Sequence, residues 1–270
     1  MILLYISLGL FVLFCLYLFC LAGRTGHPDM EKLRGWSYAH RGLHDENLPE
    51  NSMAAFRAAL EAGYGIELDV HLLKDGNLAV IHDASLKRTA GADITVEELT
   101  TEELEKYRLA GTAETIPQFQ QVLDLFAGKA PLIVELKCVN GNHGALCEAA
   151  CKMLDRYDGL YCMESFDPRA IIWLRKHRPD IIRGQLAENW MTKKMPLPVF
   201  LKFAMTYHIS NVCTRPDFIA YKFADRKVFG TEICRKWLGI QGVSWTLRSR
   251  EEYDTAVAEN WIPIFENFKI

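Results

Sequence analysis

The sequence lacks a strong charge of either sign. Its 270 residues contain 31 Lys and Arg against 34 Asp and Glu, which leaves a formal net charge of −3. A protein that binds nucleic acid through the phosphates needs a concentrated basic surface, so we exclude nucleic acid as the main partner. A substrate that carries phosphate must then be held by a few local cations. The chain also lacks low-complexity segments and signs of a second globular domain, and nothing in it predicts a protein partner.

Charged side chains are absent from Met1 to Gly23. Ile2–Ala22 would form a helix about 30 Å long, which matches the hydrocarbon core of a bilayer. A secretory signal peptide would have a basic residue before the apolar run and small residues at a cleavage site, and neither feature is evident. We therefore expect an uncleaved transmembrane anchor at residues 1–23, followed by a linker at residues 24–35.

Two further features predict the side of the membrane. Arg24, Lys32 and Arg34 follow the apolar run, and by the positive-inside rule they place the rest of the chain in the cytoplasm. The later cysteines lack the tight spacing of a disulfide scaffold, which agrees with a reducing compartment. Cys147 and Cys151 would lie one helical turn apart, but without a second pair or an adjacent His we interpret them as buried thiols rather than a zinc site.

Residues 36–270 alternate short apolar runs with segments of helical periodicity. Eight runs have the character of strands: Trp36–His40, Gly65–His71, Leu132–Lys137, Leu160–Phe166, Ile182–Leu186, Ile209–Cys213, Gly242–Leu247 and Ile262–Glu266. Alternation predicts a parallel sheet with helices outside it, and eight repeats predict a closed (β/α)8 TIM barrel of the α/β class. Residues 84–115 are longer than a simple connection needs, and we expect them to form a small insertion over the barrel mouth.

An Asp-Gly pair predicts a β-hairpin extension of the second strand. A two-residue turn at Asp75 and Gly76 would set Asp69 directly opposite His82. Because side chains alternate along a strand, Glu67 would share the face of Asp69. Carboxylates this close repel each other unless a cation lies between them. The alternative is a solvated hairpin of mixed charge, with no function in its pattern.

Short polar motifs occur in a fixed order around this hairpin: His40-Arg41-Gly42, Glu50-Asn51-Ser52, Glu67-Leu68-Asp69-Val70, His82-Asp83 and Glu135-Leu136-Lys137. This order resembles the glycerophosphodiester phosphodiesterase family, whose pattern is His-Arg-Gly, Glu-Asn-Thr, Glu-x-Asp-Val, His-Asp and Glu-Ile-Lys. The resemblance extends from Trp36 to the end and is fainter after Pro168. It implies a phosphodiesterase barrel similar to that of phosphatidylinositol-specific phospholipase C. The implied activity is hydrolysis of glycerophosphodiesters to an alcohol and glycerol phosphate.

The chemistry of these side chains predicts their roles. They fall at or near the carboxyl ends of predicted strands, where barrel enzymes keep their active sites. Glu67, Asp69 and Glu135 form an all-oxygen set suited to Mg²⁺ or Ca²⁺, and the resemblance implies the same metal ligands. His40 and His82 are then free to act as general acid and general base, in an order that the sequence leaves open.

Other residues are expected to hold the substrate. Arg41 and Lys137 would bind the phosphate, and Trp245 would pack against the glycerol moiety, with plain core packing as its alternative. His44 and His71 are expected to be peripheral.

Two neighbouring residues are expected to support the site. Glu50 would orient Arg41 or His40. Asn51 would either support the site or cap the helix that begins near Met53, and the sequence favours the cap slightly.

The substrate is less well defined than the reaction. Arg248 stands where many family members have Asn, and the ending Phe265-Glu266-Asn267 replaces a common Thr-Asp. The substrate therefore stays open between glycerophosphodiesters and lysophospholipids, and a phosphatidylinositol-specific phospholipase C-like or a lysophospholipase D-type phosphodiesterase is the alternative. A hypothesis of another class is a membrane-tethered module that binds head groups without catalysis; loss of either His40 or His82 would have favoured it.

Overall fold

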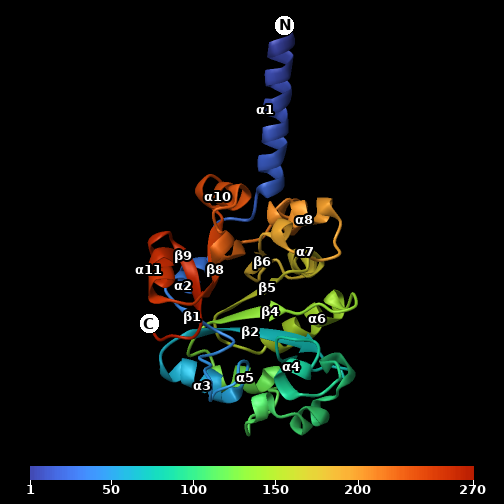
Figure 1. Ribbon diagram of the computed structural model, residues 1–270, viewed down its shortest axis with the longest axis vertical. Helices are drawn as coiled ribbons and strands as arrows, with labels where there is room; N and C mark the ends of the chain where they lie inside the picture. The colour runs from blue at the N-terminus through green and yellow to red at the C-terminus, as the bar shows by residue number, and fades with distance from the viewer.

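A computed structural model describes residues 1–270 and shows a sheet of nine strands that closes on itself (Figure 1). The strands are β1 (Tyr38–His40), β2 (Gly65–Leu72), β3 (Leu78–Val80), β4 (Leu132–Leu136), β5 (Tyr161–Ser165), β6 (Arg183–Ala187), β7 (Phe218–Lys222), β8 (Gln241–Leu247) and β9 (Trp261–Phe265). β3 pairs antiparallel with β2, and the other eight strands are parallel. β1 pairs with both β2 and β9, which closes the barrel and confirms the predicted fold class.

Helices surround the strands. They are α1 (Ile2–Leu21), α2 (Met30–Arg34), α3 (Met53–Glu61), α4 (Lys87–Ala90), α5 (Phe119–Phe126), α6 (His143–Leu154), α7 (Pro168–His177), α8 (Val199–Thr206), α9 (Asn211–Thr214), α10 (Phe229–Lys236) and α11 (Arg250–Ala258), with 3₁₀ turns η1 (Val96–Glu98), η2 (Thr101–Lys106), η3 (Leu109–Gly111), η4 (Trp190–Thr192) and η5 (Phe223–Asp225). Local signals set their starts. At α7, Asp167 accepts a hydrogen bond from the N–H of Arg169 (2.9 Å) and Pro168 occupies the first turn.

One predicted strand is wrong. Ile209–Cys213 was expected to be the sixth strand, but α9 covers most of it and β7 begins later, at Phe218. A short apolar run does not distinguish a strand from a short helix packed on the barrel, because both bury most of their side chains. Asn211 supplies the local reason, since its buried side-chain amide donates to the carbonyl of Leu21 (3.0 Å).

The register of the β2–β3 hairpin also differs from the prediction by one residue. The loop holds three residues, 74–76, because Gly76 adopts a φ of 86° at the third position. Ile81 therefore occupies the place expected for His82, and its N–H donates to the carbonyl of Asp69 (3.1 Å). β3 ends at Val80, so the backbone at His82 no longer follows the strict alternation of a strand.

Apolar side chains fill the end of the barrel interior where the strands begin. Tyr38, Ile133, Cys162 and Phe218 are buried there in one cluster. α2 covers this end and adds two buried side chains to the cluster. Residues 24–35, expected to be a linker, thus pack against the barrel through α2.

Residues 84–115 contribute to an apolar cluster that they share with the hairpin. Leu86, Val96 and Leu104 are buried together with Leu73 and Ile81. Two capping boxes, in which Thr95 and Thr100 bond reciprocally with the Glu three residues later, start η1 and η2. The insertion is therefore an ordered part of the barrel.

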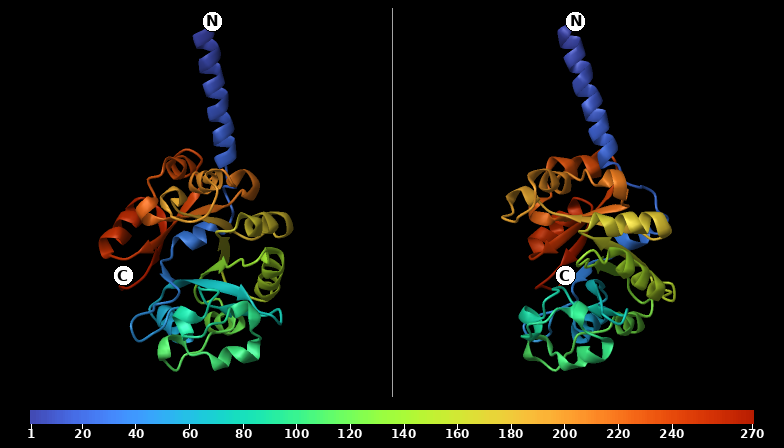
Figure 2. Two further views of the ribbon diagram at one scale, coloured as in Figure 1. Left: turned by 45° about the vertical axis from the view of Figure 1, so that its right-hand side comes forward. Right: turned by 90° about the vertical axis from the view of Figure 1, so that its right-hand side faces the viewer.

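α1 is long and apolar enough to cross a membrane. Leu21 alone among its residues is buried, and the helix extends away from the barrel with α8 and α10 beside its lower end, as Figures 1 and 2 show.

Candidate active site

Three carboxylates meet inside the barrel near the carboxyl ends of the strands. Glu67 and Asp69 lie two residues apart on β2, and the register of β2 and β4 places Asp69 beside Glu135. One carboxylate oxygen from each lies within 4.8 Å of the others. Their exposed fractions are 3%, 0% and 6%, so water screens their mutual repulsion weakly.

A single ammonium group neutralises part of this charge. Lys137 Nζ lies 2.9 Å from Asp69 Oδ1 and 2.8 Å from Glu135 Oε1. A fourth carboxylate, that of Glu164 on β5, pairs in register with Glu135 and is also buried. Glu164 was not identified from the sequence, although its place two residues after Cys162 on a predicted strand carried the signal. The four carboxyl groups thus outnumber the nearby cationic groups, which are Lys137 and Arg41, whose Nε lies 3.5 Å from Asp69 Oδ2.

The pKa values of these carboxyl groups move in different directions because their surroundings differ. Burial and then the neighbouring Asp69 raise the pKa of Glu67 well above its usual value. Burial raises the pKa of Glu135 to about 7 against the pull of Lys137. Burial also acts on Asp69, but Lys137 and other nearby cationic groups hold its pKa below the usual range. A hard divalent cation with oxygen ligands would relieve this repulsion, so Glu67, Asp69 and Glu135 fit Mg²⁺ or Ca²⁺.

His40 ends β1 beside this cluster. Its Nδ1 is hydrogen-bonded to Glu266 Oε2 (2.5 Å), and its Nε2 faces Glu67 Oε2 at 3.8 Å. Arg248 Nε (2.7 Å) and His44 Nε2 (3.7 Å) also approach the Glu266 carboxylate. His44, expected to be peripheral, therefore lies in the layer behind His40.

Glu266 is a residue that the sequence could have pointed to. It follows β9, and barrel closure pairs Ala39 with Phe265, so the residues that come next, His40 and Glu266, must be neighbours. Burial acts against ionisation of Glu266, but the hydrogen bond from His40 and the nearby imidazole of His44 hold its pKa below the usual range.

His82 approaches from the hairpin side. Its Nδ1 is hydrogen-bonded to Asp83 Oδ1 (2.6 Å), and Asp83 accepts from Arg88 Nε (2.5 Å) in the insertion. His71, expected to be peripheral, is buried below, with Nε2 3.2 Å from the carbonyl of His82 and Nδ1 2.5 Å from Glu97 of η1. The insertion thus holds the hairpin end in place.

The two catalytic candidates have the same arrangement. Each imidazole of His40 and His82 uses Nδ1 to bond a carboxylate, which leaves Nε2 for another group. Burial lowers the pKa of both imidazoles. The bond to Glu266 opposes this for His40, and the charge of Asp69 opposes it for His82.

Arg41 and Asn51 connect the first loop to the carboxylates. Arg41 has a left-handed φ of 55°, uncommon outside glycine, and its N–H donates to Glu67 Oε2 (3.2 Å). Its Nη1 donates to Glu50 (3.0 Å), and Asn51 Nδ2 donates to Asp69 Oδ2 (2.7 Å). The cap of α3 is Ser52, which accepts from the N–H of Ala55 (3.1 Å), so the capping role considered for Asn51 is wrong.

Aromatic rings form another part of the rim. Trp245 on β8 is partly exposed and packs edge-to-face on Phe166 (5.6 Å between centroids), which packs in the same way on Trp190 of η4 (5.9 Å). This row reaches from the barrel strands into the long segment after β6.

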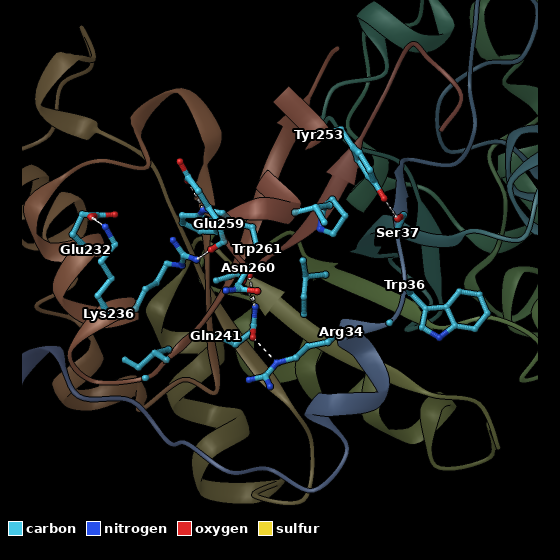
Figure 3. A pocket seen from close by; sticks show the side chains of 18 of the residues that line it. Arg34, Trp36, Ser37, Glu232, Lys236, Gln241, Tyr253, Glu259, Asn260 and Trp261 are labelled. Carbon is cyan, nitrogen blue, oxygen red and sulfur yellow. Dashed lines mark hydrogen bonds and ion pairs between the residues drawn. The ribbon is translucent and has the colours of Figure 1, made fainter. Parts of the chain in front are cut away.

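A cavity of 910 Å³ lies elsewhere. It is lined by Arg34, Gln241, Tyr253 and Trp261 among others (Figure 3), at the end where β8 and β9 begin. None of the residues expected to act in catalysis lines it. Arg34 donates there to Gln241 (2.6 Å), and the drawn Glu232 and Lys236 pair with each other. In barrels of this class the end where strands begin serves stability, so this cavity is not the candidate active site.

Comparison with known proteins gives a consistent answer. The model of the glycerophosphoryl diester phosphodiesterase family matches residues 40–259. A glycerophosphodiester phosphodiesterase of Caldanaerobacter subterraneus is 38% identical over 231 residues, which cover 81% of this chain and 88% of the relative. A glycerophosphodiester phosphodiesterase of Bacillus altitudinis is 43% identical over 111 residues, 38% of this chain and 44% of that relative.

Two further matches concern fold and substrate class. A solved phosphodiesterase of Oleispira antarctica, in complex with its product sn-glycerol-3-phosphate, has a TM-score of 0.71 at 20% identity, over 87% of this chain and 93% of that one. This likeness shows a shared fold. A protein of Rattus norvegicus named lysophospholipase D is 33% identical over 132 residues, which cover 44% of this chain and 40% of that protein.

Proposed function

The chain belongs to the glycerophosphoryl diester phosphodiesterase family, and we propose that it hydrolyses glycerophosphodiesters to an alcohol and glycerol phosphate with a divalent cation and two histidines. The observation that carries this proposal is the buried group of Glu67, Asp69 and Glu135, flanked by His40 and His82. A structural role alone would not favour several buried carboxylates with one nearby lysine.

Glu67, Asp69 and Glu135 would hold the cation. The cation that they would hold, Mg²⁺ or Ca²⁺, would supply Lewis-acid stabilisation of the phosphate charge and would lower the pKa of the attacking hydroxyl. The buried oxygen donors support a hard cation rather than zinc, since zinc sites usually recruit His or Cys. Asn51 and Lys137 orient the carboxylates through hydrogen bonds to Asp69 and Glu135.

The histidines would transfer the protons. One Nε2 removes a proton from the attacking hydroxyl, and the other Nε2 gives a proton to the departing alcohol oxygen. Glu266 and Asp83 orient His40 and His82 for this purpose through the Nδ1 bonds. Lys137 and Arg41 stabilise the negative charge of the phosphoryl oxygens.

A lysophospholipid is the second candidate substrate. The rat relative named lysophospholipase D and the aromatic row of Trp245, Phe166 and Trp190 favour it, because that row would accommodate an apolar substituent beside the phosphate. Glycerophosphodiesters remain the first candidate, since a relative that matches over 81% of this chain at 38% identity is named a glycerophosphodiester phosphodiesterase.

The proposal includes a membrane anchor. α1 supports it by its length and its lack of charge, and Arg24, Lys32 and Arg34 after it favour a cytoplasmic barrel by the positive-inside rule.

Assay of the full-length chain tests the function. A panel of glycerophosphodiesters and lysophospholipids is incubated with and without EDTA, and the alcohol and phosphate products are identified. We expect the wild-type chain to release glycerol phosphate only when the cation is present. Glu135→Gln should give no product. Glu148→Gln, an exposed matched control on α6, should hydrolyse the substrate at the normal rate.

Other outcomes identify the alternatives. A cyclic phosphate product would mean that the substrate's own 2-hydroxyl attacks, as in a phospholipase C-like reaction. Binding of head groups without any product would support the non-catalytic module and contradict the proposal.

A further inference from the structure

Exposed apolar side chains gather around the lower end of α1. Beyond Leu21, nine large apolar side chains are exposed, and eight of them lie in residues 191–203 and 229–237. The ninth is Val257 on α11. Figures 1 and 2 place α8 and α10, which carry most of the eight, beside the end of α1 where it meets the barrel. Soluble proteins rarely expose apolar side chains in such a concentrated group without a partner.

α1 is fixed to the barrel at this place. Leu21 is buried against Ile219 and Ile240. Arg215 donates to the carbonyl of Ala22 (2.7 Å) and its guanidinium lies over the ring of Phe19. These contacts fix the orientation of the barrel relative to α1, so the connection between them is not a flexible linker.

Contacts higher on α1 give the depth of α10. The ring of Trp237 lies 6.0 Å from that of Phe14, and the ring of Phe229 lies 6.4 Å from that of Tyr17. Phe14 precedes Leu21 by seven residues, about 10 Å along a helix. A helix of 20 residues spans about 30 Å, the full hydrocarbon core. If α1 crosses a bilayer, the exposed rings of Phe229 and Trp237 must then reach the boundary of that bilayer.

The charge of this region points to the same partner. Residues 188–239 hold nine Lys and Arg against four Asp and Glu, in a chain whose net charge is −3. Lys194, Lys227 and Lys236 are exposed there. Apolar rings with basic residues around them are typical of surfaces that lie in the head-group region of anionic membranes.

We propose that α8, α10 and residues 191–198 form a membrane-contact face, which lies in the head-group region of the bilayer that α1 crosses. The inference rests on the membrane anchor in the proposed function. Its consequence concerns substrate access. Trp190 directly precedes residues 191–198 of this face, and its ring packs on Phe166, which packs on Trp245 at the barrel rim. An acyl chain in the membrane would therefore have an apolar route toward the site.

Photo-crosslinking of the full-length chain tests the contact. Benzoylphenylalanine replaces one residue at a time in protein reconstituted into vesicles of phosphatidylcholine and phosphatidylglycerol, and lipid adducts are measured by mass spectrometry. The test positions are Phe200 on α8 and Trp237 directly after α10. Leu8 in α1 is the positive control, and Val257, an apolar side chain that is 46% exposed on α11, is the negative control.

We expect lipid adducts at Phe200 and Trp237 in yields comparable to Leu8 and several-fold above Val257. Adducts at Leu8 with only background at Phe200 and Trp237 would overturn the proposal, and crosslinks from those positions to a second copy of the chain would do so too. Background at Leu8 as well would overturn it together with the anchor. Hydrolysis of a soluble glycerophosphodiester by the same samples separates that failure from failure of the proposed chemistry.

Discussion

The apolar and the charged layers of the barrel interior are built on the same strands, two residues apart. On β1, Tyr38 lies in the apolar layer and His40 in the charged one. β4 repeats this with Ile133 and Glu135, and β5 with Cys162 and Glu164, so that a single step along each strand changes the environment. The apolar layer gains stability from burial, whereas the charged layer loses stability because its carboxylates repel each other out of water.

The difference separates what keeps the barrel folded from what makes it an enzyme. Substitutions in the apolar layer should lower stability without changing chemistry, and substitutions in the charged layer should remove activity without lowering stability. Variants in and around the two layers test that division, from the largest expected effect to the smallest.

The largest effects are expected at the two histidines. His40→Ala and His82→Ala should each lower kcat by about 10²- to 10⁴-fold, the usual contribution of a positioned acid or base, with little change in thermal stability. A p-nitrophenyl phosphodiester has a leaving group that needs no proton, so the variant without the general acid should recover most of its rate on it. Near-native kcat in both variants, or loss of metal binding in both, would contradict the assigned roles.

The apolar layer should show the opposite pattern. Phe218→Ala removes a fully buried ring and should lower the free energy of unfolding by about 3–5 kcal/mol. At a temperature where the variant is folded, kcat on a soluble diester should stay near that of the wild type. Denaturant unfolding and steady-state kinetics measure the two quantities, and a large loss of kcat with normal stability would break the division between the layers.

A histidine outside both layers should make stability depend on pH. His208 is fully buried against Thr231, and burial lowers its pKa to about 3. Its unfolded pKa is near 6.5, so the unfolded state binds the proton first and stability falls as the pH drops below about 6.5. Between pH 7.5 and pH 5 the loss should be about 2 kcal/mol. His208→Gln should flatten this slope, and the exposed His177→Gln should leave it unchanged; equal slopes in all three proteins would contradict the assignment.

Removal of one charge from the charged layer should raise the free energy of unfolding and abolish activity. Glu67→Gln eliminates one of the mutually repelling carboxylates, and in chelated protein we expect about 1–2 kcal/mol of added stability. The same variant should lose hydrolysis of glycerophosphodiesters. Chemical unfolding in EDTA gives the first result, and a destabilised variant would mean that Glu67 has a structural role.

The smallest pair of effects comes from adjacent residues. Ser52→Ala removes the cap of α3 and should cost about 1 kcal/mol of stability with activity retained. Asn51→Ala removes the bond to Asp69 and should lower activity with less effect on unfolding. Reversed results would show that the two side chains act in the opposite roles.

The sequence predicted the barrel, and it predicted which motif residues meet inside it, because the motifs fall at strand ends where the fold brings them together. Glu67, Asp69 and Glu135 needed only the period of a strand and the parallel order of β2 and β4. Contacts between distant segments were harder to predict. The structure shows that Glu266 is the partner of His40 and that Glu97 is the partner of His71.

Local geometry explains the errors. The hairpin register depended on the left-handed conformation of Gly76 in a three-residue loop, which an Asp-Gly pair does not distinguish from a two-residue turn. The segment 209–213 is mostly helical for a tertiary reason, since Asn211 within it binds the carbonyl of Leu21 at the end of α1. The apolar side chains of α2 likewise gave no sign in the sequence that this helix covers the end of the barrel where the strands begin.

Thermal unfolding of the chelated, full-length chain with increasing Mg²⁺ or Ca²⁺ tests the central claim most directly, because it measures whether the charged layer requires a cation. We predict that the melting temperature rises with the ion until the site is saturated, by an amount equivalent to about 2.7 kcal/mol at a hundred times Kd, and that hydrolysis returns over the same concentrations. The rise should be absent in Glu135→Gln. Full activity in EDTA, with a melting temperature that no divalent ion changes, would contradict the account.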